Sequence, residues 1–317
     1  MATRAEAFTG RLPVSTTGIK RLMAEHPVTS FFATALIGTW LFQAPMILSS
    51  DGLGLLPYQV PFPIFVVLFL LSTFAGPTLG AVVVTDALEG RAGVRRFFRR
   101  YVQWRVGILP YLIVLFGYPL LWLAAVSSQL GLAPLQAIAG QPSSFLTSYL
   151  AGVLVFPAII QWGEEPGWRG FALTRLQERY SPLVAALVVG LVHGVWHLPN
   201  FLMVGGPNAA GPFDPVQFGL NILLIMVISI AFSWVYNRAN QSILIAVLIH
   251  SSFNASQAWG GGLVPNVPRA AEYVLMGLYV LIAVILVVAT KGRLGYSPEQ
   301  GGNPVERTAR QAESEEA

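Results

Sequence analysis

The chain has 317 residues, of which 54% are hydrophobic and only 11% are charged, and its formal net charge is +4. A soluble domain carries about 25% charged residues, so this composition, with a mean hydropathy of +0.61, excludes a soluble globular protein. Cysteine is absent. The chain therefore has no disulfide, thiolate metal site or cysteine nucleophile.

Apolar stretches along the chain predict membrane-spanning helices, because a helix needs about 20 apolar residues to cross a bilayer. Eight such stretches occur, at residues 31–49, 61–84, 106–126, 145–162, 183–204, 216–236, 243–259 and 273–290. The first is too long for a signal-peptide core and no cleavage pattern follows it, so we expect it to be retained. The sequence predicts an all-α polytopic membrane protein with about eight transmembrane helices.

The basic residues predict the orientation, because Lys and Arg are held on the cytoplasmic side during insertion. The N-terminal segment, the even-numbered loops and the tail together hold every Lys and Arg except Arg269. We therefore expect both termini in the cytoplasm and the protein in the cell membrane, most simply a bacterial inner membrane. Segment 95–101 interleaves arginines with aromatics next to two spans. Acidic membrane lipid is its expected partner, and nucleic acid is not.

The fourth stretch ends in two acidic residues, Glu164 and Glu165. Glu165 and Arg169 are spaced i and i+4 with the acid first, which favours an ion pair on a helix. Pro166 and Gly167 predict a kink or a restart of the helix at this point. Glu164 points about 100° away from its neighbour and stays available for chemistry. An ordinary salt bridge at an interfacial helix end is the alternative.

Three of the four histidines fall inside predicted spans, where ionisable groups are costly and usually mark function. His193 and His197 are i and i+4, a spacing that suits two zinc ligands on one helix face. His250 and Asn254 repeat this spacing and can both donate hydrogen bonds to an oxyanion. A packing role and ordinary interhelical hydrogen bonds are the alternatives. Trp196 and the residues after His197 indicate a bend near the outer end of the fifth stretch.

Together these groups can hydrolyse a bond with water activated by a carboxylate and oriented by an imidazole. The three motifs read Glu164-Glu165-Pro166-Gly167-Trp168-Arg169, His193-Gly194-Val195-Trp196-His197 and His250-Ser251-Ser252-Phe253-Asn254. In this order, on separate apolar helices, they resemble the CAAX protease and bacteriocin-processing family. Its members are intramembrane endopeptidases that include the type II CAAX prenyl endopeptidases. The resemblance covers about residues 145–260.

The resemblance implies a role for each matching residue. Glu164 is implied as the general base on water, supported by Glu165 and Arg169, and His197 as the residue that positions the water. His250 and Asn254 are implied as the oxyanion donors. No cofactor is required by this mechanism.

His193 departs from the family pattern, which usually has an aromatic residue at this position. Either His193 is a packing variant, or it strengthens a metal site. Zinc is therefore an alternative cofactor, with ligands drawn from Glu164, His193, His197 and His250.

The apolar stretches, the basic residues and the resemblance together divide the chain. Residues 1–30 are expected to form a cytoplasmic segment, 31–144 the first transmembrane helices, 145–260 the protease core, 261–290 the last transmembrane helix and 291–317 a disordered cytoplasmic tail. Because the acidic pair ends the fourth stretch, we expect a site that opens to the cytoplasm. The expected substrate is a membrane-associated peptide or protein tail, plain or lipidated.

Two other classes of protein stay open. In a proton-coupled transporter the acids and histidines would form a proton relay, although the two similar halves typical of many transporters are not evident. A non-catalytic peptide-binding or immunity protein would keep the motifs for folding alone.

Overall fold

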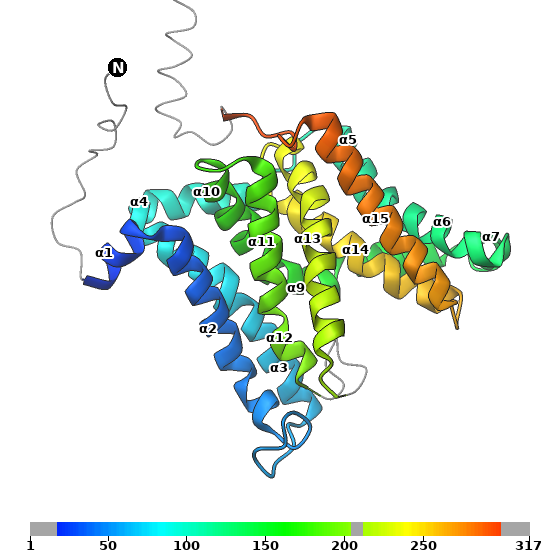
Figure 1. Ribbon diagram of the computed structural model, residues 1–317, viewed down its shortest axis with the longest axis horizontal. Helices are drawn as coiled ribbons and strands as arrows, with labels where there is room; N and C mark the ends of the chain where they lie inside the picture. The colour runs from blue at the N-terminus through cyan, green and yellow to red at the C-terminus, as the bar shows by residue number, and fades with distance from the viewer. Residues whose placement is uncertain (1–17, 204–211, 299–317) are drawn as a thin grey trace, which may run out of the picture.

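The computed structural model describes residues 18–203 and 212–298, and within them the regular structure is helical with no strand (Figure 1). The predicted all-α polytopic membrane fold is confirmed. The elements in chain order are α1 Gly18–Glu25, α2 Pro27–Leu48, α3 Phe62–Thr73, η1 Phe74–Thr78, α4 Leu79–Arg99, η2 Arg100–Val102, α5 Ile108–Leu112, η3 Ile113–Gly117, α6 Tyr118–Leu130, α7 Ala133–Gly140, η4 Phe145–Leu150, α8 Ala151–Leu154, α9 Phe156–Glu165, η5 Pro166–Leu173, α10 Thr174–Gln177, α11 Pro182–Trp196, α12 Leu198–Phe201, α13 Pro215–Arg238, α14 Ile243–Leu263 and α15 Arg269–Thr290.

Six helical runs in the described residues are long and apolar enough to cross a membrane. They are Pro27–Leu48, Phe62–Val102, Ile108–Leu130, Phe145–Gln177, Pro215–Arg238 and Arg269–Thr290. The other two predicted stretches are also helical. The fifth is α11, with only 15 residues before the chain turns at His197, and α12 follows it, so the bend expected there is present. The seventh is α14, with 21 residues.

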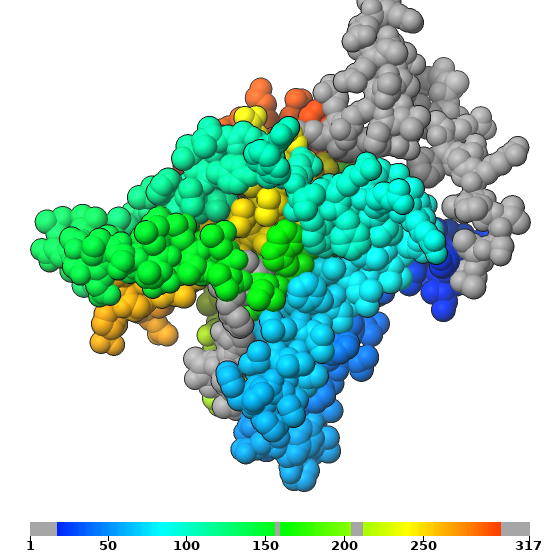
Figure 2. Space-filling view, turned by 180° about the vertical axis from the view of Figure 1, so that it is seen from behind, coloured from blue at the N-terminus to red at the C-terminus, as the bar shows by residue number. Residues whose placement is uncertain are grey.

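The helices form two groups. In Figure 1, α2, α3, α11 and α13 run from the upper to the lower part of the view, whereas α6, α14 and α15 run obliquely to one side. From behind, residues of α5 to α8 reach sideways from the column formed by α2 and α3 (Figure 2). Within the first group α11 lies very close to α13, because a Cβ added at Gly190 or Gly194 would lie 2.6 or 2.9 Å from a Cα atom of α13. Small residues allow such close helix packing in membranes.

The helix does not restart at Pro166, contrary to one of the two predicted outcomes, but it changes there from α-helical to π-helical turns. Pro166 has helical dihedral angles, φ −57° and ψ −38°, and residues Pro166–Leu173 form wide π-helical turns that lead directly into α10. Wide turns accommodate the missing N–H of proline without ending the helix. Glu164 therefore lies well inside the run Phe145–Gln177, roughly 20 Å from its C-terminal end by helical rise. The predicted position at a cytoplasmic helix end is wrong.

The basic segment after the second stretch is helical. Helix α4 continues to Arg99 with one break at Gly90, whose φ of +63° is readily adopted only by glycine. Arg100 then turns inward and donates to the carbonyls of Gly170 (2.9 Å) and Gln241 (3.0 Å). The prediction that segment 95–101 faces lipid is therefore wrong for Arg100.

Residues 291–298, which follow α15, pack against the helices. Leu294 is fully buried, and its carbonyl accepts a hydrogen bond of 3.0 Å from the side chain of Asn237 on α13. The prediction of a disordered tail from residue 291 is wrong for residues 291–298. Residues 299–317, the rest of that tail, and Arg4 and Arg11 of the predicted cytoplasmic segment lie outside the described residues.

Candidate functional site

The first acidic residue of the pair contacts a histidine of another helix. Glu164 on α9 and His193 on α11 are 4% and 3% exposed, and Oε2 of the carboxylate lies 3.2 Å from Nε2 of the imidazole. An ionised carboxylate only accepts hydrogen bonds, so when Glu164 is ionised the proton of the imidazole lies on Nε2. The indole of Trp168 stacks on the imidazole, with ring centroids 4.7 Å apart. The hydrogen bond and the stacked indole therefore fix the position of the His193 ring.

His197 follows one turn later, where α11 ends. Its Nδ1 lies 2.9 Å from the backbone carbonyl of His193. A carbonyl only accepts, so Nδ1 carries the proton and Nε2 of the neutral ring is an acceptor. One ligand atom from each of Glu164, His193 and His197 lies within 4.8 Å of the others. The structure thus brings the first and second motifs together.

The second acidic residue is shared by two partners. Oε1 of Glu165 lies 2.7 Å from Nη1 of Arg169, so the ion pair expected from the spacing is present, with side chains at most 1% exposed. The same oxygen also lies 2.7 Å from Nδ1 of His250 on α14. Glu165 therefore connects the first motif to the third, a contact that the i and i+4 spacing alone did not predict.

The third motif lies along α14. Because Nδ1 of His250 donates to Glu165, its Nε2 can donate a second hydrogen bond only when the ring is protonated. Asn254 lies one turn further on, half-buried, and its side chain makes no hydrogen bond to the described part of the chain. Both predicted oxyanion donors, His250 and Asn254, thus lie on α14, the helix that Glu165 contacts.

Sequence reasoning missed several groups that support this cluster. Nη2 of Arg169 donates to the hydroxyl of Ser229 on α13 at 3.4 Å, and that hydroxyl donates to a carbonyl of α11 at 2.8 Å. Gly163 and Gly167 flank the acidic pair and face the junction of α3 and η1. A Cβ at these positions would lie 2.5 Å from Thr73 Oγ1 and 2.6 Å from the carbonyl oxygen of Pro77. The i and i+4 spacing of the two glycines was the available signal.

A metal ion fits these residues only in part. Two zinc ligands at about 2.0–2.2 Å in a tetrahedral site lie roughly 3.3 Å apart, close to the 3.2 Å between Glu164 and His193. His197 also meets the requirement that a ligating imidazole donates its other N–H, here to a carbonyl. Nδ1 of His193 is buried and has no partner in the described residues. The second ligand therefore lacks the support that zinc-binding imidazoles normally have.

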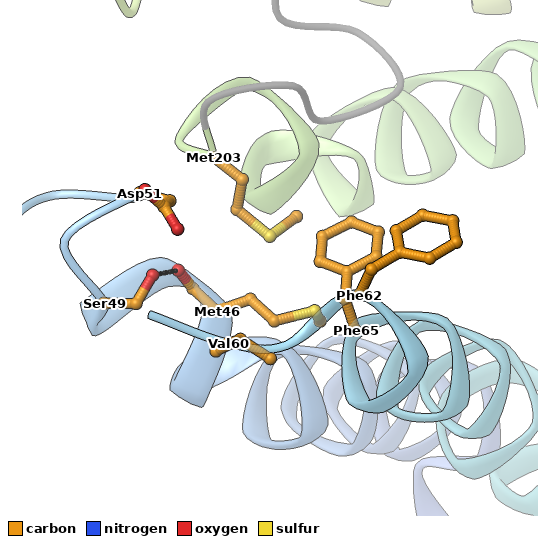
Figure 3. Close-up of a pocket in the computed structure, with 7 residues that line it drawn as sticks. All are labelled: Met46, Ser49, Asp51, Val60, Phe62, Phe65 and Met203. Atoms are coloured by element: carbon orange, nitrogen blue, oxygen red, sulfur yellow. Dashed lines mark hydrogen bonds between the residues drawn. The ribbon is translucent and has the colours of Figure 1, made fainter. Parts of the chain in front are cut away.

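Two cavities lie apart from this cluster. The first, of about 240 Å³, is lined by residues of the α2–α3 end and by Met203 beyond α12. Figure 3 shows the side chains of Met46 and Met203 extending into it beside Phe62 and Phe65. It includes none of the predicted site residues.

The second cavity, of about 380 Å³, lies between α6, α13, α14 and α15 and is almost entirely apolar; its lining includes Tyr118 and Ile249. Phe232 contacts both the site and a residue of this lining, because its ring centroid lies 5.4 Å from that of His250 and 6.1 Å from that of Tyr118.

The motif residues and their geometry can be compared with known proteins. Residues 144–256 match the family described as type II CAAX prenyl endopeptidase Rce1-like. The resemblance predicted from the three motifs is confirmed. This Rce1-like segment contains every residue of the cluster, from Glu164 to Asn254, and it starts after α7.

The chain is also similar in sequence to a known protein over about half of its length. The chain is 27% identical over 149 residues to the CAAX prenyl protease 2 of Methanococcus maripaludis, and the alignment covers 47% of the chain and 53% of the relative. The chain thus spans about half the length of the curated relative that it matches.

Proposed function

We propose that the protein is an intramembrane endopeptidase that hydrolyses a peptide bond in a membrane-associated peptide or protein tail. The 3.2 Å contact between Glu164 and His193 carries this proposal. It fixes one oxygen of a buried carboxylate, while the other oxygen, Oε1, has no hydrogen-bond partner in the described residues and is available to water. The second carboxylate, Glu165, is already occupied by Arg169 and His250.

Glu164 acts as the general base. Its carboxylate takes a proton from water while the water oxygen bonds to the substrate carbonyl carbon and the π electrons move to the carbonyl oxygen. Nε2 of His197 accepts the second hydrogen of the water and so orients its lone pair. As the C–N bond breaks, Glu164 gives the proton to the leaving nitrogen. The products are an amine and a carboxylic acid.

His250 and Asn254 stabilise the tetrahedral intermediate. In this step the ring of His250 is protonated: its Nδ1–H stays on Glu165, and its Nε2–H donates to the oxyanion. Arg169 balances the remaining charge of that carboxylate at 2.7 Å. The side-chain amide of Asn254, which has no protein partner among the described residues, donates the second hydrogen bond. Glu165 and Arg169 thus support the site without touching the substrate.

We derive no step through a metal ion. A zinc ion on Glu164, His193 and His197 would consume the carboxylate that serves as base, and Glu165 is not free to replace it. The unpartnered Nδ1 of His193 also argues against zinc. His193 instead holds the base through its Nε2–H.

The substrate is proposed to carry a lipid chain. The similar protein from Methanococcus maripaludis is a CAAX prenyl protease by name, and the apolar cavity of about 380 Å³ lies one aromatic ring away from His250. Apolar walls with few polar atoms suit a hydrocarbon chain. Residues 145–260 form the protease core, both termini face the cytoplasm, and the cell membrane is the site of action.

Peptide cleavage by the purified full chain in detergent tests the function. A library of lipidated and plain peptides is incubated with wild type and with Glu164→Gln, and products are identified by mass spectrometry. We expect hydrolysis by wild type and a loss of about 10²- to 10⁴-fold in kcat for Glu164→Gln, the usual contribution of a general base. Glu272→Gln, an exposed acid in the first turn of α15, is the matched control.

The alternatives give other results. A non-catalytic binding protein would bind peptides without cleaving them, and Glu164→Gln would leave that binding unchanged. A proton-coupled transporter would move protons in proteoliposomes in a manner that depends on Glu164. Either result, with no cleavage by folded wild type, overturns the proposed function.

A further inference from the structure

Helix α2 lies outside the Rce1-like segment, yet it holds the turn that carries both histidines of the second motif. Nε1–H of Trp40 donates to the backbone carbonyl of Trp196 at 3.2 Å. Nε1–H of Trp196 donates in return to the hydroxyl of Thr39 at 2.7 Å. Two neighbouring residues of α2 therefore bind both the backbone and the side chain of Trp196, which directly precedes His197.

These contacts meet a specific need at the end of α11. The last four carbonyls of a helix lack partners within the helix, and α11 ends at Trp196. Leaving such a carbonyl unpaired inside a membrane protein costs free energy, and Trp40 supplies the missing donor. Thr39 is itself fixed, because it is fully buried and donates to the carbonyl of Ser72 at 2.9 Å.

The side chain of Trp196 passes this constraint to both imidazoles. Its ring lies perpendicular to that of His197, with centroids 4.8 Å apart. It also lies 5.6 Å from the ring of His193. If the indole rotated, the ring of His197 would lose the surface against which it packs. The hydrogen bond from its Nδ1–H to the carbonyl of His193, which leaves Nε2 as an acceptor, would then weaken.

We propose that Thr39 and Trp40 are positioning residues, which fix the turn from His193 to His197 for the hydrolysis of the peptide bond. This inference rests on the proposed function and gives the N-terminal helices a part in it. Thr39 and Trp40 do not touch the substrate. They act through Trp196 on the direction in which His197 presents Nε2 to water.

The kinetic test uses substitutions that remove a hydrogen bond and keep most of the packing. Thr39→Val, Trp40→Phe and the double variant are compared with wild type for kcat, KM and thermal midpoint in detergent. We expect the double variant to lose at least tenfold in kcat with KM within twofold. Thr39→Ser retains the hydroxyl, so its kcat is expected to stay close to that of wild type. Thr147→Val and Trp104→Phe, both at exposed positions, are the matched controls.

A second readout does not depend on activity. The chain has only four histidines, so ¹⁵N-histidine labelling gives few imidazole resonances, and single His→Ala variants assign them. We expect Thr39→Val and Trp40→Phe to shift the resonances of His197 and His193, with those of His26 unchanged. Unchanged His197 resonances in a folded double variant overturn the positioning role. Shifted resonances in a chain whose wild type cleaves no peptide support the positioning role and overturn the proposed function alone.

Discussion

Nε2 of His193 lies 3.2 Å from Oε2 of Glu164, although the two residues belong to different helices. The sequence left His193 either as a packing variant or as part of a metal site. The contact suggests a third role, in which the imidazole holds the general base by a hydrogen bond. The ring also stacks on Trp168, so an aromatic replacement preserves the packing and tests the hydrogen bond alone.

We expect His193→Phe to keep the fold and lower kcat. A hydrogen bond to a charged group contributes about 1.5–3 kcal/mol, which corresponds to roughly a 10- to 100-fold loss of rate. His193→Gln retains an N–H donor and should lose less. The measurement is kcat on a cleaved peptide beside the thermal midpoint. Full activity of His193→Phe would show that the imidazole only packs.

Removal of metal should leave the activity unchanged. Glu164 serves as base in the proposed mechanism, so a chelator has nothing to remove. Purified protein is treated with 1,10-phenanthroline, its zinc content is measured by mass spectrometry, and the rate of cleavage is compared before and after. Stoichiometric zinc, a loss of activity on chelation and recovery on addition of zinc would instead establish the site at Glu164, His193 and His197.

Breaking the buried ion pair should destabilise the protein. Glu165→Gln leaves the guanidinium of Arg169, 1% exposed, without its counter-charge. Removal of one partner of a buried pair typically costs about 3–5 kcal/mol. Unfolding in detergent should show this loss, and the double variant Glu165→Gln/Arg169→Gln should regain part of it. Glu25→Gln, in the exposed pair with Arg21, should show no measurable change. Equal stability of Glu165→Gln and Glu25→Gln would contradict the role of the pair as support.

The close approach of the acidic segment to η1 should not tolerate a larger residue. A Cβ at Gly167 would lie 2.6 Å from the carbonyl oxygen of Pro77, so Gly167→Ala must move backbone against backbone. Such overpacking costs about 1–3 kcal/mol. Gly219→Ala on α13, where a Cβ would meet nothing within 4 Å, should be neutral or slightly stabilising. Thermal unfolding of both variants distinguishes packing from a general effect of alanine.

Filling the apolar cavity should affect lipidated substrates selectively. Ala231 lines the cavity on α13, and Ala231→Phe places a ring in the space proposed for the lipid chain. We expect KM to rise at least tenfold for a lipidated peptide and to change little for the matching plain peptide. Equal effects on both peptides would place the lipid chain elsewhere.

The sequence by itself determined the membrane class, the apolar stretches and the residues of the three motifs. These follow from composition and from spacing within one helix, which sequence shows directly. Local spacing also predicted the Glu165–Arg169 pair, and the residues after His193 predicted the bend at the end of α11. At Pro166 the sequence predicted a kink or a restart, and the helix does not restart there. Wide turns absorbed the proline instead.

Only the tertiary structure decided which helices meet. His250 contacts Glu165, and Thr39 and Trp40 form hydrogen bonds with Trp196. Each of these contacts joins helices that are distant in the chain. No local pattern encodes such pairings, because they depend on how closely glycines such as Gly163 and Gly190 let neighbouring helices approach. The residue types of each motif follow from the local sequence, whereas their relative positions arise from packing between helices. For that reason residues of α2 can support a site whose motifs begin more than a hundred residues later.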